Sequence, residues 1–257
     1  MDEQQVRILE DLQGEFDGEL GFDPVTREIY SCDASIYQIL PLGVAFPKHT
    51  DDVVKLALYA YENDIPLIAR GAGSGVAGGC IGRGIVIDFA RHMNKILSVD
   101  SQHVRVQPGV VRDQLNRHLR QFNRYLPPDP SNTAVTTIGG MLAVDAAGSH
   151  AVRVGSTRDY AKSIELVLAD GFKFEAGFVE DAISIPMPSR ENDLIHQLAL
   201  LLKENQDLIR ERQPALIRNS AGYQFRGVLE GKSLNLPRML VGSEGTLGLF
   251  TEATLHT

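Results

Sequence analysis

The segment Arg70-Gly71-Ala72-Gly73-Ser74-Gly75-Val76-Ala77-Gly78-Gly79 decides how the rest of the chain is interpreted. Seven of the 24 glycines in the 257 residues lie between Gly71 and Gly84. Apolar strands are predicted on both sides of the segment, at Ile65–Ala69 and Gly84–Phe89. Successive backbone amides in such a loop can point inward and bind an anion, because glycine leaves them unobstructed. The segment therefore predicts a phosphate-binding loop. The alternative is a flexible surface loop, which is uncommon between two apolar strands.

Two familiar phosphate-binding motifs do not fit this loop. Residues Gly73 to Gly78 match the dinucleotide pattern G-x-G-x-x-G, but that pattern requires a helix directly after the loop, and a strand is predicted here. The P-loop of nucleotide triphosphatases requires Lys-Ser or Lys-Thr after the glycines, and neither is present. A nicotinamide-type Rossmann fold and a P-loop fold are therefore rejected.

The remaining hydrophobic pattern predicts a mixture of helices and strands. The order around the glycine loop is helix, strand, loop, strand, which is typical of an α/β unit, whereas the middle of the chain reads as antiparallel strands. Residues Phe22–Pro47 are expected to be irregular. Predicted helices cover Val6–Phe16, Thr50–Asn63, Val111–Phe122 and Glu191–Arg212, and further predicted strands cover Ile96–Val99, His103–Gln107, Ile164–Leu168, Phe172–Ala176, Met239–Val241 and Leu247–Leu255.

Three further segments are rich in small or rigid residues. They are Pro127–Ser131, with three prolines, Thr136–Ser149, with paired glycines, and Gly242–Gly248. Taken singly, each has an ordinary structural explanation, namely a turn or a tight contact between a helix and a sheet. Together with the glycine loop, they indicate an extended ligand that backbone contacts along its length, and a dinucleotide fits better than a mononucleotide.

Composition and scattered polar residues narrow the function further. The net charge of −8 argues against nucleic acid as the main partner. Two cysteines, no apolar run of transmembrane length and an acidic N-terminus predict a protein of a reducing compartment without a membrane span or signal peptide, cytoplasmic or peripheral to a membrane. The seven histidines are scattered, so no metal site is expected, and only His150 lies beside a candidate segment. No nucleophile-and-base motif is present, which suggests that a cofactor carries the chemistry.

In their order and spacing, the segments resemble the FAD-binding domain of the vanillyl-alcohol oxidase and p-cresol methylhydroxylase superfamily, and most closely its D-lactate and glycolate dehydrogenase branch. The resemblance implies an α+β, FAD-binding type-2 fold of two α/β subdomains, one with a mainly parallel and one with a mainly antiparallel sheet. It implies a single FAD-binding domain over residues 1–257, with subdomains at about 1–95 and 96–257. The residues that carry it are Pro47–Val54, Arg70–Gly75 with Gly78-Gly79, Ile87-Asp88, Gln107–Val110, Pro127–Ser131, Thr137–Gly140, Gly148, Gly155, Leu168–Gly171 and Gly242–Gly248.

The resemblance also implies roles by position. The glycine loop would hold the FAD pyrophosphate, with Arg70 either adding a cation or forming a structural ion pair. The segments Pro127–Ser131 and Thr136–Ser149 would line the flavin and its ribityl chain, and Glu244, Gly245 and the region of Leu249 would reach the adenosine. The implied cofactor-binding residues are Arg70, Gly71, Ala72, Gly73, Ser74, Gly75, Gly78, Gly79, Pro130, Ser131, Thr137, Gly139, Gly140, Ala143, Asp145, Gly148, Gly155, Glu244, Gly245 and Leu249.

Three departures from the family pattern matter. Covalent members carry a flavin-linking histidine where Ser74 stands, so we expect noncovalent FAD. Many relatives have asparagine at the position of Asp145, where a carboxylate near the flavin would disfavour the reduced, anionic flavin. In relatives, a substrate-binding cap with arginines and metal-binding histidines follows the point where this chain stops, so we expect the catalytic base and carboxylate clamp to lie outside these residues.

The expected function is oxidation of a D-2-hydroxy acid such as lactate or glycolate, with hydride transfer to FAD and an electron acceptor other than a nicotinamide. Segments Tyr30–Tyr37, Pro41–Gly43 and Arg218–Tyr223 are similar to long members that fuse the dehydrogenase to an iron–sulfur segment. Two alternatives remain open. One is a reductase resembling the enolpyruvyl-glucosamine reductases of cell-wall synthesis, and the other is a non-catalytic flavin-binding module.

Overall fold

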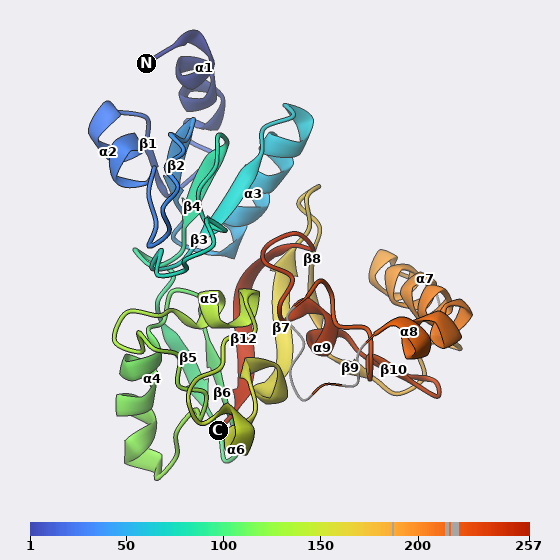
Figure 1. Cartoon of the computed structure of the whole chain (residues 1–257). Coiled ribbons are helices and arrows are strands. Elements are labelled where there is room, and N and C mark those ends of the chain that lie inside the picture. Colours follow the sequence, from blue (N-terminus) through green and yellow to red (C-terminus); the bar gives the residue numbers. More distant parts are fainter. Residues whose placement is uncertain (187, 214–215, 217–220) are drawn as a thin grey trace.

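The structure, a computed structural model, describes residues 1–186, 188–213, 216 and 221–257. Two lobes are visible, each built around its own sheet (Figure 1). The helices are α1 (Glu3–Leu12), α2 (Pro24–Ile29), α3 (Thr50–Glu62), α4 (Arg112–Leu119), α5 (Ile138–Ala143), α6 (Ala151–Val154), α7 (Arg190–Glu204), α8 (Gln206–Arg212) and α9 (Leu236–Leu240), with 3-10 turns at Arg120–Phe122 and Thr157–Tyr160.

The first lobe holds a mainly parallel sheet in the order β1-β2-β4-β3. Strand β4 pairs in parallel with both β2 and β3, and β1 adds an antiparallel edge. Helices α1 and α3 bury Ile8, Leu12, Val53 and Leu56 against this sheet. The strands are β1 (Glu19–Gly21), β2 (Gly43–Phe46), β3 (Leu67–Arg70) and β4 (Ile85–Asp88).

The second lobe holds a fully antiparallel sheet in the order β5-β6-β12-β7-β8. Its central strand, β12, pairs with β6 on one side and β7 on the other. A small antiparallel sheet, β10-β11-β9, lies beside it with α9. The strands are β5 (Ile96–Val99), β6 (His103–Val106), β7 (Ala161–Val167), β8 (Lys173–Ala176), β9 (Phe178–Val179), β10 (Leu229–Glu230), β11 (Ser233–Asn235) and β12 (Leu249–His256).

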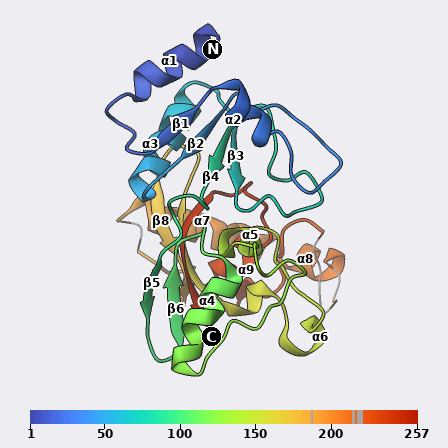
Figure 2. The ribbon, with the colours of Figure 1, turned by 90° about the vertical axis from the view of Figure 1, so that its left-hand side faces the viewer.

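The two lobes meet where β12 begins, beside α3 and α5 (Figures 1 and 2). Val167 and Leu249 belong to the strands of the second sheet, yet both are buried in the hydrophobic core of the first lobe. The predicted combination of a mainly parallel and a mainly antiparallel sheet is confirmed. The junction between the two sheets is where a ligand that touches both lobes has to lie.

Several element predictions need correction. The predicted strand at Met239–Val241 is wrong, because Asn235 caps a helix there: its side chain accepts a hydrogen bond from Arg238 N at 3.2 Å. The predicted helix Glu191–Arg212 is two helices divided at Asn205. The segment expected to be irregular contains α2 and β2. Of the motif Arg218–Tyr223, residues 218–220 lie outside the described residues.

Candidate functional site

The glycine loop, residues 71–84, is the whole connection between the adjacent parallel strands β3 and β4. Parallel neighbours require a crossover of about a dozen residues or more, usually a helix, and here the loop alone makes it. Gly73 and Gly78 have φ angles of +68° and +76°, a backbone conformation that residues with a side chain rarely adopt. The loop therefore turns back on itself at the carboxyl end of β3, the edge of a parallel sheet where ligands bind.

The loop glycines fall into two groups when the methyl group of an alanine is placed at each position. At Gly71 it would collide with Thr137 Oγ1, and at Gly73 it would lie 2.5 Å from Arg70 Nη2. At Gly75 and Gly79 no atom of the described residues lies within 4 Å. The first two glycines are required by the fold itself. The latter two leave open backbone that a ligand can approach.

A cavity lies between the lobes next to this loop. Its wall combines the end of β3, the residue after β4, the first turns of α5 and the start of β12. Seven of the predicted residues line it, namely Arg70, Gly71, Thr137, Gly139, Gly140, Ala143 and Gly245. Sequence reasoning missed Ala69, Phe89 and Phe250 as cavity-wall residues. Pro108 and Gly248 also line the cavity; they lie in the highlighted segments Gln107–Val110 and Gly242–Gly248 but were not named as binding residues. For Phe89 and Phe250 the available signal was their position directly after β4 and at the start of β12.

Helix α5 forms from the small-residue run and supplies one wall. Thr137 caps it by accepting a hydrogen bond from Gly140 N at 3.3 Å. The amides of Ile138 and Gly139 donate to the carbonyls of Val110 and Pro108, each at 2.8 Å. The first amides of α5 are thus bonded within the protein. Helix α5 therefore offers a ligand a surface without large side chains, made by Gly139, Gly140 and Ala143.

The turn Gly242–Gly248 supplies a second wall of the cavity and is fixed to the end of α5. Gly242 N donates to Leu142 O at 2.9 Å, and Glu244 N donates to Ala143 O at 2.8 Å. Glu244 has a φ of +53° and its side chain is exposed. The two walls therefore keep their spacing through backbone bonds.

Asp145 lies at the end of α5 and pairs with Arg158. Its Oδ2 is 3.2 Å from Arg158 Nη1, its Oδ1 accepts from Arg158 N at 2.9 Å, and both side chains are at least nine-tenths buried. Arg158 Nη2 also donates to Val241 O at 2.5 Å. Burial lowers the pKa of Arg158, and Asp145 acts in the opposite direction. The carboxylate at position 145 is thus compensated by a buried cation rather than standing alone.

Other predicted residues lie away from the cavity wall. At Gly148 a methyl group would collide with the Asp129 carbonyl, and at Gly155 with the Asp159 carboxylate, so both glycines serve chain packing. Leu249 is a core residue that also lines a neighbouring groove. The full set outside the cavity wall is Ala72, Gly73, Ser74, Gly75, Gly78, Gly79, Pro130, Ser131, Asp145, Gly148, Gly155, Glu244 and Leu249.

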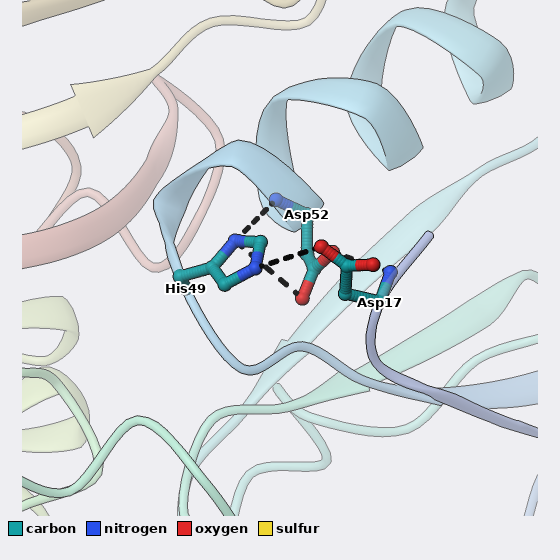
Figure 3. A group of neighbouring side chains, drawn as sticks. All are labelled: Asp17, His49 and Asp52. Atoms are coloured by element: carbon teal, nitrogen blue, oxygen red, sulfur yellow. Dashed lines mark hydrogen bonds and ion pairs between the residues drawn. The ribbon is translucent and has the colours of Figure 1, made fainter. Parts of the chain in front are cut away.

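One cluster of possible metal ligands occurs in the part of the chain that the structure describes, far from the glycine loop in sequence: Asp17, His49 and Asp52 (Figure 3). The buried Asp52 carboxylate accepts hydrogen bonds from Asp17 N at 2.9 Å and Lys48 N at 2.8 Å. His49 Nδ1 accepts from Asp52 N at 3.3 Å and His49 Nε2 lies 3.2 Å from Asp17 Oδ2. These bonds cap the start of α3 and account for the cluster without an ion.

With a volume of about 60 Å³ the cavity can hold only part of FAD, a long cofactor. Backbone without bulky side chains lines it from both lobes and open loop backbone adjoins it, so the cavity marks one contact along an extended ligand. No helix among the described residues is long and apolar enough to cross a membrane.

Curated relatives match nearly the whole chain. The chain is 35% identical over 259 residues to D-2-hydroxyglutarate dehydrogenase of Pantoea ananatis, covering 96% of this chain and 25% of the relative. It is 32% identical over 231 residues to glycolate oxidase subunit GlcD of Bacillus subtilis, covering 88% of this chain and 39% of the relative. The chain thus spans about a quarter to two-fifths of the length of these relatives.

The solved structure of an alkyldihydroxyacetonephosphate synthase shares the fold, with a TM-score of 0.67, 21% identity, and coverage of 99% of this chain and 40% of that one. The family model described as the FAD binding domain matches residues 41–176, more than half of the chain and the part that holds the glycine loop and α5. The chain therefore belongs to the FAD-binding domain family, with FAD as its cofactor.

Proposed function

We propose that this chain is the FAD-binding part of an enzyme that oxidises a D-2-hydroxy acid. The observation that carries the proposal is the cavity between the two lobes, built from the same segments that carry the family resemblance. The two relatives described above are named for hydroxy acids, 2-hydroxyglutarate and glycolate. D-Lactate, glycolate and D-2-hydroxyglutarate are therefore the first substrates to test.

Each lobe has its own task in this proposal. The open backbone at Gly75 and Gly79 receives the pyrophosphate through amides, which suits a chain with a net charge of −8. The bulk-free face of α5 and the turn at Gly245 receive the rest of the cofactor. Bound FAD supplies the acceptor for the substrate hydride. Ser74, which has no imidazole to form a flavin link, leaves the cofactor noncovalent.

The groups that bind and deprotonate the substrate lie outside this chain in our proposal. The relatives are about four times and two and a half times as long as the matched region, so they have room for a cap domain and, in the longest, for an iron–sulfur electron acceptor. We assign no catalytic residue within these residues. The two free cysteines, Cys32 and Cys80, support a reducing compartment such as the cytoplasm.

The first experiment is a titration of the purified chain with FAD, followed by its absorption and fluorescence. We expect flavin bands in the bound state and full release of the flavin on denaturation. Flavin that stays with the denatured protein would refute the noncovalent assignment. Absence of any FAD binding would refute the role of the cavity.

The second experiment uses the full-length protein under anaerobic conditions. We expect a D-2-hydroxy acid to bleach the flavin and NADPH to leave it oxidised. Bleaching by NADPH alone would favour a reductase, and bleaching by neither would favour a flavin-binding module.

A further inference from the structure

Arg70 does not extend freely into the cavity, because its guanidinium packs beneath the glycine loop. Its Nη1 lies 3.8 Å from Cys80 Sγ, and a methyl group at Gly73 would lie 2.5 Å from its Nη2. Its Cζ stands 5.1 Å from the centre of the Tyr30 ring, within cation–π range. Arg70 therefore touches both the start and the far end of the loop.

We propose that Arg70 and Asp33 are positioning residues: with Cys80 and Tyr30 they brace the glycine loop from beneath and hold its backbone ready for the FAD pyrophosphate. The proposal rests on the assignment of FAD to this family and not on the identity of the substrate. Of the two roles that the sequence left open for Arg70, a cation for the phosphate and a structural contact, it favours the structural one.

Asp33 ties the loop to a second segment. Its Oδ1 accepts from Ser35 N at 2.8 Å and its Oδ2 accepts from the Cys80 thiol at 3.6 Å. Beside it, Ala34 N donates to Gly73 O at 3.0 Å. Although desolvation acts in the opposite direction, hydrogen bonds from Ser35 and Cys80 and the charge of Arg70 lower the pKa of Asp33, so its carboxylate is ionised.

Cys80 and Tyr30, the two side chains that contact Asp33 and Arg70, have defined hydrogen-bond roles. Burial raises the pKa of the Cys80 thiol to about 11, so the thiol remains a donor to Asp33 at neutral pH. The Tyr30 hydroxyl donates to the carboxylate of Asp88, whose Oδ1 accepts from Ala90 N at 2.6 Å and Arg91 N at 3.1 Å. The ring beneath Arg70 is thus held by the end of β4.

The contacts leave part of the loop bare. Tyr37 lies against Gly78, where a methyl group would come within 3.1 Å of its ring, while Gly75 and Gly79 meet no described atom within 4 Å. An anion-binding loop loses affinity if its amides must be ordered at the moment of binding. A brace at Gly73, Gly78 and Cys80 removes that cost for the residues between them.

The test compares Asp33→Asn, Arg70→Met and the double variant. Asparagine keeps the oxygen that accepts from Ser35 N, removes the negative charge near Arg70, and replaces the oxygen that accepts from the Cys80 thiol with an amide that cannot accept. The exposed pair Asp207 and Arg210 on α8, 3.0 Å apart, provides matched controls, Asp207→Asn and Arg210→Met. The readouts are the FAD dissociation constant, hydrogen exchange of the amides of residues 73–80 in the FAD-free protein, and the melting temperature.

We expect each single variant at the brace to raise the FAD dissociation constant about tenfold, to speed exchange in residues 73–80 and to leave the melting temperature close to that of the wild type. The double variant should bind FAD no worse than the weaker single variant, because both residues act through their contacts with Cys80. The controls should change neither affinity nor exchange.

Arg70→Lys separates bracing from direct phosphate binding. A lysine keeps the charge but cannot reproduce the planar contact with Tyr30, Cys80 and Gly73, so we expect it to bind FAD as weakly as Arg70→Met. Recovery of affinity by Arg70→Lys, additive effects in the double variant, or normal affinity of Asp33→Asn would each overturn the brace. If Arg70→Met does not fold, the affinity and exchange of Asp33→Asn decide the question alone. Failure of the wild type to bind FAD refutes the cofactor site instead.

Discussion

Gly71 and Gly75 lie four residues apart in one loop, but alanine at each should have a different consequence. Gly75→Ala places a methyl group in open space, so the free energy of unfolding should stay close to that of the wild type, while the FAD dissociation constant rises about tenfold or more. Gly71→Ala drives a methyl group into Thr137 and should lower the free energy of unfolding by about 1–3 kcal/mol. Urea unfolding and FAD titration of both variants test this. Unchanged FAD affinity in Gly75→Ala would show that the open backbone is not the FAD site.

The buried pair of Asp145 and Arg158 makes a second prediction at this scale. Asp145 has a φ of +50°, which asparagine tolerates as well as aspartate, so Asp145→Asn removes charge without adding backbone strain. The variant leaves Arg158 buried and uncompensated, and its free energy of unfolding should fall by about 3 kcal/mol. Asp145→Asn with Arg158→Met should recover part of that loss. Equal stability of Asp145→Asn and the wild type in urea unfolding would contradict the pairing.

Asp129 and His150 connect the prolyl segment to the run after α5, with Asp129 Oδ2 2.5 Å from His150 Nδ1. The hydrogen bond from His150 lowers the pKa of Asp129 below its ordinary value of 3.8. The contribution of this hydrogen bond to the free energy of unfolding is therefore complete above about pH 4. It is lost as the pH falls further, through the lowered pKa of Asp129. Asp129→Asn should reduce stability at neutral pH, and the difference from the wild type should vanish in strong acid. Thermal unfolding between pH 2 and 7 measures it. A difference that is constant across this range would contradict the assignment.

At the scale of elements, α5 links the loop to the cavity, and its cap can be tested. Thr137→Val keeps the shape of the buried side chain and removes the acceptor for Gly140 N, so about 1 kcal/mol of stability should be lost. Ser189→Ala removes the corresponding cap of α7, where Ser189 Oγ accepts from Asn192 N at 3.2 Å. Both variants should lose similar stability in urea unfolding, but only Thr137→Val should weaken FAD binding. Equal FAD affinity in both would mean that α5 does not shape the site.

The strands on both sides of the glycine loop could be predicted, because a short apolar run bordered by glycine indicates a buried strand from the local sequence alone. Prediction failed where a helix cap or a contact with another segment decides the structure. A run as short as Met239–Val241 is compatible with helix or strand, and the cap at Asn235 settled it. The side chain of Arg70 could have pointed to a phosphate or beneath the loop, and the partners that settled this, Tyr30 and Cys80, come from separate segments. Pro108 and Phe250 joined the cavity wall only through the pairing of the lobes.

At the scale of the whole molecule, Glu165 on β7 joins the two lobes through hydrogen bonds. Its Oε1 accepts hydrogen bonds from Thr50 at the start of α3, at 3.0 Å, and from the buried Thr251 on β12, at 2.8 Å. Since FAD is expected to contact both lobes, the cofactor and the Glu165 carboxylate would both connect the first lobe to the second. Glu165→Ala should therefore lower the stability of the FAD-free protein by about 1–3 kcal/mol.

Because a ligand that binds only the joined state stabilises it in proportion to its concentration, saturating FAD should restore much of the lost stability in Glu165→Ala. Calorimetry of the FAD-free variant should show a broader transition than that of the wild type, since the lobes then unfold less cooperatively. Glu175→Ala is the control: it removes a carboxylate on β8 that is bonded to Arg105 within the second lobe alone, 3.0 Å away. Broadening in both variants, or in neither, would show that Glu165 does not couple the lobes.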